Sequence, residues 1–77
     1  MVYRYTTPLG TFAIRPHRAD SYRVELWIEE QKKCFRSYSS PRHAAADVAA
    51  HSTGFEQWDS SAVQVPENLE EWANSPT

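Results

Sequence analysis

The N-terminal half of the chain alternates apolar and polar residues with a period of two, which is typical of strands with one buried face. Residues 2–5 (VYRY) and 11–15 (TFAIR) flank the turn sequence TPLG, and this pattern predicts a β-hairpin. The run at 22–29 (YRVELWIE) is the clearest strand in the chain. Its apolar face carries Tyr22, Val24, Leu26 and Ile28, and its polar face carries Arg23, Glu25, Trp27 and Glu29.

Residues 34–38 (CFRSY) predict a further strand after the polar turn at 30–33. The pattern leaves the orientation of this strand open. Either Phe35 faces the core, or Cys34 and Tyr38 do, because successive side chains point to opposite faces of a sheet. Together with the hairpin and the strand at 22–29, this segment predicts an antiparallel sheet of three to four strands.

The alanine-rich segment that follows carries both a start and a stop signal for a helix. Ser40 suits the N-cap and Pro41 suits the first helical position. Gly54 suits the position just past the end, where the backbone turns left-handed. We therefore expect the main helix at about 41–53, packed across one face of the sheet.

The apolar stripe of this helix is thin. At 100° per residue it consists of alanines and a serine, and Val48 is its only larger apolar side chain. Such a helix must lie close to the sheet, and it cannot close the core alone. We expect Phe55 and Trp58, which come directly after the helix, to complete the core.

The C-terminal segment predicts a second, short helix. Pro66 and the acids at 67, 70 and 71 suit its first turns, and Leu69 and Trp72 are spaced to dock on the core. Residues 73–77 are expected to be frayed. The fold class is therefore α+β, with residues 1–77 forming one small domain.

The chain resembles a group of short bacterial proteins of uncharacterised function. The resemblance rests on a Thr-Pro-x-Gly-x-Phe opening, a Ser-Pro-x-x-Ala-Ala helix start, a Thr-Gly-x-x-x-Trp-Asp segment and a late Pro-x-x-Leu-x-x-Trp. These patterns cover most of the chain. The resemblance implies that residues 53–59 belong to the core pattern of the fold, and it implies no catalytic or binding residue.

Size and composition narrow the class of protein. A chain of 77 residues buries only about 60% of the surface that its unfolded form exposes, so its stability is expected to be marginal. The single cysteine, Cys34, cannot form an internal disulfide, which indicates a reducing compartment. No apolar run approaches the roughly 20 residues of a membrane span. The N-terminus lacks the layout of a secretory signal, so we expect a cytoplasmic protein without a membrane partner.

Charge is distributed unevenly along the chain. Residues 1–42 hold all eight basic groups and four acids, a balance of +4. Residues 43–77 hold six acids and no Lys or Arg, a balance of −6. This asymmetry favours attraction between the two halves within the fold, although it can also mark a binding face.

Candidate catalytic and metal-binding residues are sparse. His43, Asp47 and His51 stand at i, i+4 and i+8 on the predicted helix, so neighbouring pairs could share a metal ion, but all three together could not. A solvated polar strip is the favoured interpretation. Cys34 has no Gly-rich or helix-start context, which favours a buried, inert thiol. We therefore expect a protein that is not an enzyme and that uses no cofactor.

Two binding functions remain. The favoured one is a small interaction module in which Trp27, joined by Tyr38 or Trp72, forms an aromatic patch for a protein or peptide partner. The alternative is a nucleic-acid-binding domain in which the polar face of the sheet contacts phosphates and Trp27 stacks on a base. Four arginines are the candidates for the phosphate contacts: Arg4, Arg15, Arg23 and Arg36. The oligomeric state is left open.

Overall fold

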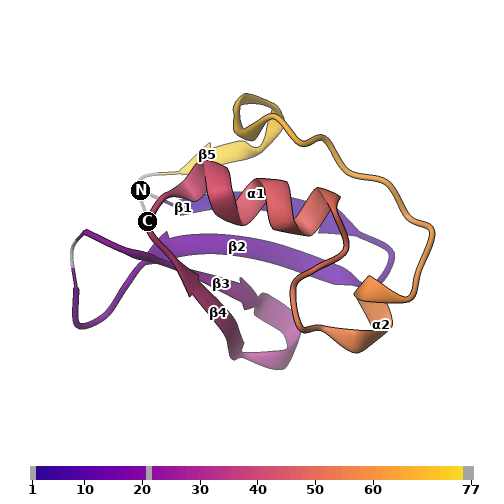
Figure 1. The fold of residues 1–77 in the computed structure, drawn as a ribbon, viewed down its shortest axis with the longest axis horizontal. Helices are drawn as coiled ribbons and strands as arrows, with labels where there is room; N and C mark the ends of the chain where they lie inside the picture. Colours follow the sequence, from indigo (N-terminus) through magenta and orange to yellow (C-terminus); the bar gives the residue numbers. More distant parts are fainter. Residues whose placement is uncertain (1, 21, 76–77) are drawn as a thin grey trace.

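A computed structural model describes residues 2–20 and 22–75 of the chain. It is an α+β fold in which one face of a five-stranded antiparallel sheet is covered by the main helix (Figure 1). The strands lie side by side in the order β4-β3-β2-β1-β5. Their bounds are β1 Val2–Thr7, β2 Gly10–Pro16, β3 Val24–Ile28, β4 Lys33–Tyr38 and β5 Ala73–Ser75. The helical elements are η1 Glu29–Gln31, α1 Pro41–Ala49, α2 Glu56–Asp59 and η2 Leu69–Glu71.

The predicted N-terminal hairpin is confirmed. Strands β1 and β2 pair up to Thr7 and Gly10, which leaves Pro8 and Leu9 as the loop. The Thr7 hydroxyl donates to the Gly10 carbonyl at 2.8 Å and accepts from the Leu9 amide at 3.1 Å. Gly10 has a φ of 139°, a backbone conformation that other residues rarely adopt. The TPLG sequence therefore fixes the turn through both a side chain and a glycine.

A β-bulge settles the orientation of β4. The pairing with β3 shifts between Leu26 and Trp27, so that Cys34 lies opposite Trp27 and Phe35 is the extra residue. Tyr38 is buried on the helix side, and the Phe35 ring lies 5.1 Å from the ring of Phe55. Neither of the two expected alternatives describes this strand, because the bulge lets Phe35 and Tyr38 both pack against the core.

The core lies between the sheet and α1. Its sheet side is built by alternate residues of β2 and β3, and its helix side by two alanines and one valine that are fully buried. Tyr22 was expected on this apolar face, but its side chain is 89% exposed because β3 begins only at Val24. The most buried members of the core are Phe12, Ile14, Leu26, Ile28, Ala44, Ala45, Val48 and Trp58.

Helix α1 starts as predicted and ends early. The Ser40 hydroxyl accepts from the His43 amide at 3.2 Å, and Pro41 is the first helical residue. The helix ends at Ala49 rather than near residue 53, because His51 takes the left-handed conformation with a φ of 58°. Gly54, which was expected to end the helix, instead serves a second turn with a φ of 89°.

The segment after α1 is held by one carboxylate. Asp59 accepts from the Thr53 amide and hydroxyl at 3.0 and 2.9 Å, and from the Gly54 amide at 2.9 Å. Burial opposes ionisation of Asp59, but these hydrogen bonds outweigh it and lower the pKa of the carboxyl. The turn positions Trp58, which is fully buried and donates its indole N–H to the Val48 carbonyl at 2.9 Å.

Trp58 completes the core as expected. Its ring meets Phe12 edge-on, with the ring centroids 4.9 Å apart, and it stacks on His51 at 4.8 Å. Phe55 is buried as well. The Thr-Gly-x-x-x-Trp-Asp pattern thus describes a turn whose last two residues have separate tasks. The tryptophan fills the core, and the aspartate binds the backbone that places it.

The C-terminal segment differs from the prediction. The expected short helix is only the single turn η2, although Leu69 and Trp72 are buried against the core as predicted. Residues 73–75, expected to be frayed, form β5 and pair with β1. Residues 76–77 lie outside the described residues. The sheet therefore has five strands rather than three to four, and in the described part of the chain no helix is long and apolar enough to cross a membrane.

Candidate nucleic-acid interface

The sheet face opposite α1, called the open face below, carries the polar residues of the strands. Arg4, Ala13 and Trp27 form one row across β1, β2 and β3, because Arg4 pairs with Ala13 and Ala13 pairs with Trp27. Ala13 is fully buried although α1 packs on the other face of the sheet. The side chains of this row are therefore a small buried alanine between a long arginine and a large indole.

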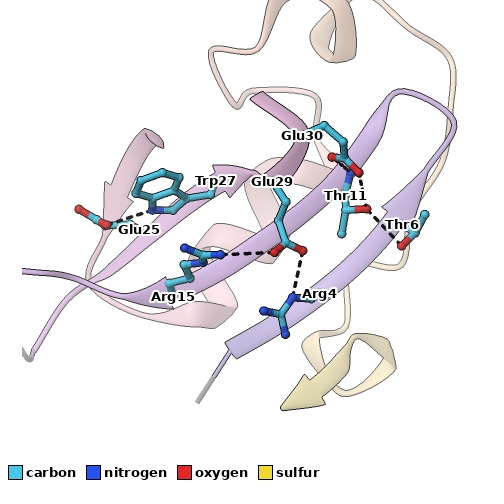
Figure 2. Close-up of polar contacts among 8 residues, drawn as sticks. All are labelled: Arg4, Thr6, Thr11, Arg15, Glu25, Trp27, Glu29 and Glu30. Carbon is cyan, nitrogen blue, oxygen red and sulfur yellow. Dashed lines mark hydrogen bonds and ion pairs between the residues drawn. The ribbon is translucent and has the colours of Figure 1, made fainter. Parts of the chain in front are cut away.

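Trp27 is half-buried and held by charged groups. Its indole N–H donates to the Glu25 carboxylate at 3.0 Å (Figure 2). The guanidinium carbons of Arg15 and Arg18 lie 5.2 and 5.8 Å from the ring centroid, within the range of cation–π attraction. The indole is therefore fixed in place, with two cations against its ring.

The acids of this face are bound by its own cations. Glu29 accepts from Arg4 Nε at 2.9 Å and from a terminal nitrogen of Arg15 at 3.3 Å, and Figure 2 shows the carboxylate between these two side chains. Glu25 is only 4% exposed and lies 3.7 Å from Arg18 and from His17. Three arginines thus pair with two carboxylates, of which Glu25 is buried and Glu29 is partly exposed.

Glu30 closes the far end of the open face. Its carboxylate accepts from the Thr11 amide at 2.7 Å and from the Thr11 hydroxyl at 3.0 Å. The hydrogen bond from the Thr11 amide is the main cause that lowers the pKa of the Glu30 carboxyl. This ionised acid ties η1 to β2 at the Thr11 end of the open face.

Beside Trp27 the open face is hollowed. A depression of about 530 Å³ is lined by three arginines, by Glu25 and Trp27, and by two apolar residues, Val2 and Pro16; the arginines are Arg4, Arg15 and Arg18. A second depression of about 460 Å³ shares Arg15 and Trp27 and extends to Glu29 and Lys32. Trp27 therefore stands between two hollows that are both edged with cations.

Of the four predicted arginines, three lie toward this face. Arg23 donates to the Ser37 hydroxyl at 3.3 Å, and Ser37 pairs with Glu25 across β3 and β4. Arg36 does not join them. It pairs with Leu26 on the helix side, where it lies 3.9 Å from Asp47.

Sequence reasoning missed Arg18, because it assigned residues 17–21 to a polar loop without a place in space. The bond from the His17 amide to the Arg23 carbonyl closes that loop. The closed loop brings the Arg18 guanidinium next to the Trp27 ring. No local pattern in the sequence predicts this placement.

The predicted aromatic patch is not assembled. Tyr38 and Trp72 are 5% and 3% exposed and belong to the core on the helix side, whereas Trp27 lies on the open face. The Tyr38 hydroxyl donates to Asp47 at 3.0 Å. Burial, followed by this bond and the charge of Asp47, raises the pKa of Tyr38 to about 12.

The helical His-Asp-His strip is occupied by other contacts. His43 is 4.0 Å from Asp47, but His51 lies beyond the end of the helix, with its Nδ1 atom 2.8 Å from the Trp58 carbonyl oxygen. Among the described residues no group of three or more His, Cys, Asp and Glu could hold a metal ion. On the helix side, Asp47 and His51 form hydrogen bonds within the fold, to the Tyr38 hydroxyl and the Trp58 carbonyl respectively.

Cys34 is half-buried opposite Trp27. Its thiol points to the Arg36 carbonyl at 3.6 Å. Burial, and then the charge of Glu25, raises the pKa of this thiol, so it is protonated at neutral pH. A protonated thiol is a poor nucleophile.

No family model, curated protein or solved structure matches the chain.

Proposed function

We propose that this protein is a non-catalytic binding domain that contacts nucleic acid through the open face of its sheet. The observation that carries the proposal is the gathering of Arg4, Arg15 and Arg18 around Trp27 on the face that α1 leaves uncovered. Arginine forms bidentate bonds to phosphate, and an indole offers a surface on which any base can stack.

The distribution of charge supports the same ligand. Acids on a binding face oppose a phosphate backbone, but Glu25 of the open face is buried and Glu29 is bridged by two arginines. Many of the remaining acids belong to α2, η2 and the loop before η2. A polyanion is therefore attracted to one side of the sheet and repelled from the other.

A protein or peptide partner gripped by aromatic side chains has less support. That hypothesis needed Tyr38 or Trp72 beside Trp27, and both are buried on the other side of the sheet. Trp27 alone, half-buried and surrounded by guanidinium groups, offers a peptide little apolar surface. If the protein did not bind nucleic acid, a module that binds a protein or peptide would become the favoured function.

Titration of the protein with a short labelled oligonucleotide, followed by fluorescence anisotropy, tests the proposal. Three phosphate contacts to a single strand predict a slope of about −2 for log K against log salt. The affinity should therefore fall by about 20-fold between 50 and 200 mM salt, as that relation gives.

Two single-arginine variants provide the matched comparison. Arg18→Ala removes a cation of the open face, and Arg42→Ala removes one from α1, where it lies 3.5 Å from Glu70. Both side chains are well exposed, so both variants should fold. Arg18→Ala should weaken binding and make the salt slope shallower by about 0.7, whereas Arg42→Ala should leave both unchanged. Equal effects of the two variants, or no binding by the wild type at low salt, would refute the proposal.

A further inference from the structure

We infer that the hollow beside Trp27 receives one unpaired base, so that the open face prefers single-stranded nucleic acid to a duplex. This inference rests on the proposed function and specifies the form of its ligand. It starts from the chemistry of the hollow, which is lined by an aromatic ring, two apolar side chains and three arginines.

The size and lining of the hollow fit a base. About 530 Å³ lies within the range of roughly 300–1,000 Å³ that is usual for sites of small organic ligands. Trp27 supplies a ring for stacking, and Val2 and Pro16 supply an apolar wall. Arg4 and Arg18 border the same hollow, where they can contact the phosphates on either side of that base.

The second hollow extends the path that a bound nucleic-acid strand can follow across the open face. It shares Arg15 and Trp27 with the first and ends at Lys32, so a strand that crosses Trp27 meets a cation before and after the indole. By contrast, a hollow of about 490 Å³ next to Arg42 is lined by Glu67 and Glu70, whose charges oppose a phosphate. The path of cations therefore follows the open face.

A duplex fits this surface poorly. Five strands at a spacing of about 4.8 Å make a sheet about 19 Å across, whereas the major groove of B-form DNA is about 12 Å wide. The indole of Trp27 lies on β3, the second strand from the β4 edge, with β4 and β2 on either side. It cannot reach a base that is paired and stacked inside a helix, whereas an unpaired base can come to it.

Three probes separate base recognition from phosphate recognition. They are a single strand of about eight nucleotides that does not pair with itself, an abasic strand with the same phosphates, and a hairpin whose stem pairs the sequence of the first strand with its complement. The base-bearing strand should bind at least about five-fold more tightly than the abasic strand, because stacking of one base contributes that much affinity. It should also bind more tightly than the hairpin at every salt concentration.

Tryptophan fluorescence identifies the ring that is involved. Trp58 and Trp72 are at most 3% exposed, so a bound base can quench only Trp27. The base-bearing strand should quench the protein, and the abasic strand should not. In Trp27→Phe, which keeps an aromatic ring, the quenching should disappear while anisotropy still reports binding.

Each outcome decides a different claim. Equal affinity for the base-bearing and abasic strands, or tighter binding of the hairpin, would overturn the inference. If binding still weakened with rising salt and in Arg18→Ala, the proposed nucleic-acid binding would stand, but the inference about an unpaired base would not. A failure of all three probes to bind at low salt would overturn both. The comparison of probes uses the wild-type protein, so it does not depend on the folding of any variant.

Discussion

The two faces of the sheet are built from the same strands, yet they differ in what holds their side chains. On the helix side, Phe12 and Leu26 are at most 1% exposed and are fixed by close packing alone. On the open face, the neighbouring Trp27 is fixed by an N–H donor bond to Glu25 and by two guanidinium groups. A close-packed core loses stability when any of its side chains changes in volume, whereas the ionic contacts of an exposed arginine can be replaced by contacts with a ligand.

This difference predicts a separation of effects. Substitutions on the helix side should lower the free energy of unfolding, and substitutions of the exposed arginines should alter binding with little change in stability. A domain of 77 residues has a free energy of unfolding of about 4–12 kcal/mol, so a single core substitution can remove a large part of it. The comparison fails if a substitution on the helix side leaves stability unchanged, or if a substitution of an exposed arginine on the open face lowers stability strongly.

The largest effect is expected for Phe12→Ala. The Phe12 side chain is 1% exposed and contacts both Trp58 and Trp72, so its removal leaves a cavity at the centre of the core. Loss of such a ring costs about 3–5 kcal/mol. Urea denaturation followed by circular dichroism measures this loss. A cost of no more than about 0.5 kcal/mol, the usual range for a surface site, would show that the helix side is not a packed core.

The next effect is expected for Asp59→Ala, which removes the acceptor of three hydrogen bonds in the turn that places Trp58. Loss of a capping side chain costs about 0.5–2 kcal/mol. Because the folded-state pKa of Asp59 is lowered, its contribution is complete above the unfolded pKa of about 3.9 and is lost as the pH falls through the folded pKa.

Denaturation curves at neutral and at acidic pH test this dependence. The difference in stability between the wild type and Asp59→Ala should shrink at the acidic pH. Glu56→Ala is the control, because this acid lies in the same short helix and is exposed. A constant difference at both pH values would mean that the ionised carboxylate is not what holds the turn.

The same contrast explains which parts of the fold could be predicted. The hairpin, β3 and the start of α1 depend on local patterns of alternation, turn residues and capping, and they were predicted close to their observed bounds. Strand β5 was missed because Ala73, Asn74 and Ser75 have little strand propensity, and only pairing with β1 makes them a strand. The early end of α1 depends on His51, whose ring binds the Trp58 carbonyl from outside the helix.

The candidate interface was predicted only in part, for a related reason. The period of two assigned Trp27 to the polar face of its strand, but it left open whether Arg4 and Arg15 join it, because it could not tell which strands are neighbours or in which register they pair. The bulge in β4 changed the parity of that strand and placed Tyr38 and Arg36 on the helix side. Arg18 reaches Trp27 through a loop, and no periodic pattern describes loops.

A smaller effect is expected for Tyr38→Phe, which removes one hydrogen bond to Asp47 and keeps the ring in the core. Its cost should be about 1 kcal/mol. Because the folded-state pKa of Tyr38 is raised to about 12, the neutral phenol contributes stability that is complete below the unfolded pKa of about 10 and is lost as the pH rises through the folded pKa.

An absorbance titration of tyrosinate tests the raised pKa. One of the four tyrosines should ionise near pH 12 in the wild type, and this step should be absent from Tyr38→Phe. Tyr22→Phe is the control, since that side chain is 89% exposed. If Tyr22→Phe removed the late step instead, the bond between Tyr38 and Asp47 would not be the cause.

The smallest effect on stability is expected for Arg18→Ala, and this substitution tests the comparison most sharply. The Arg18 side chain is 78% exposed, and its ion pair with Glu25 at 3.7 Å is of a kind that contributes little. The free energy of unfolding should change by no more than about 0.5 kcal/mol, while affinity for a single strand falls. A large loss of stability would instead assign Arg18 to the fold, as a clamp that holds Trp27 against the sheet. The open face would then be a second packed layer, and the arginines around Trp27 would no longer be evidence for a ligand.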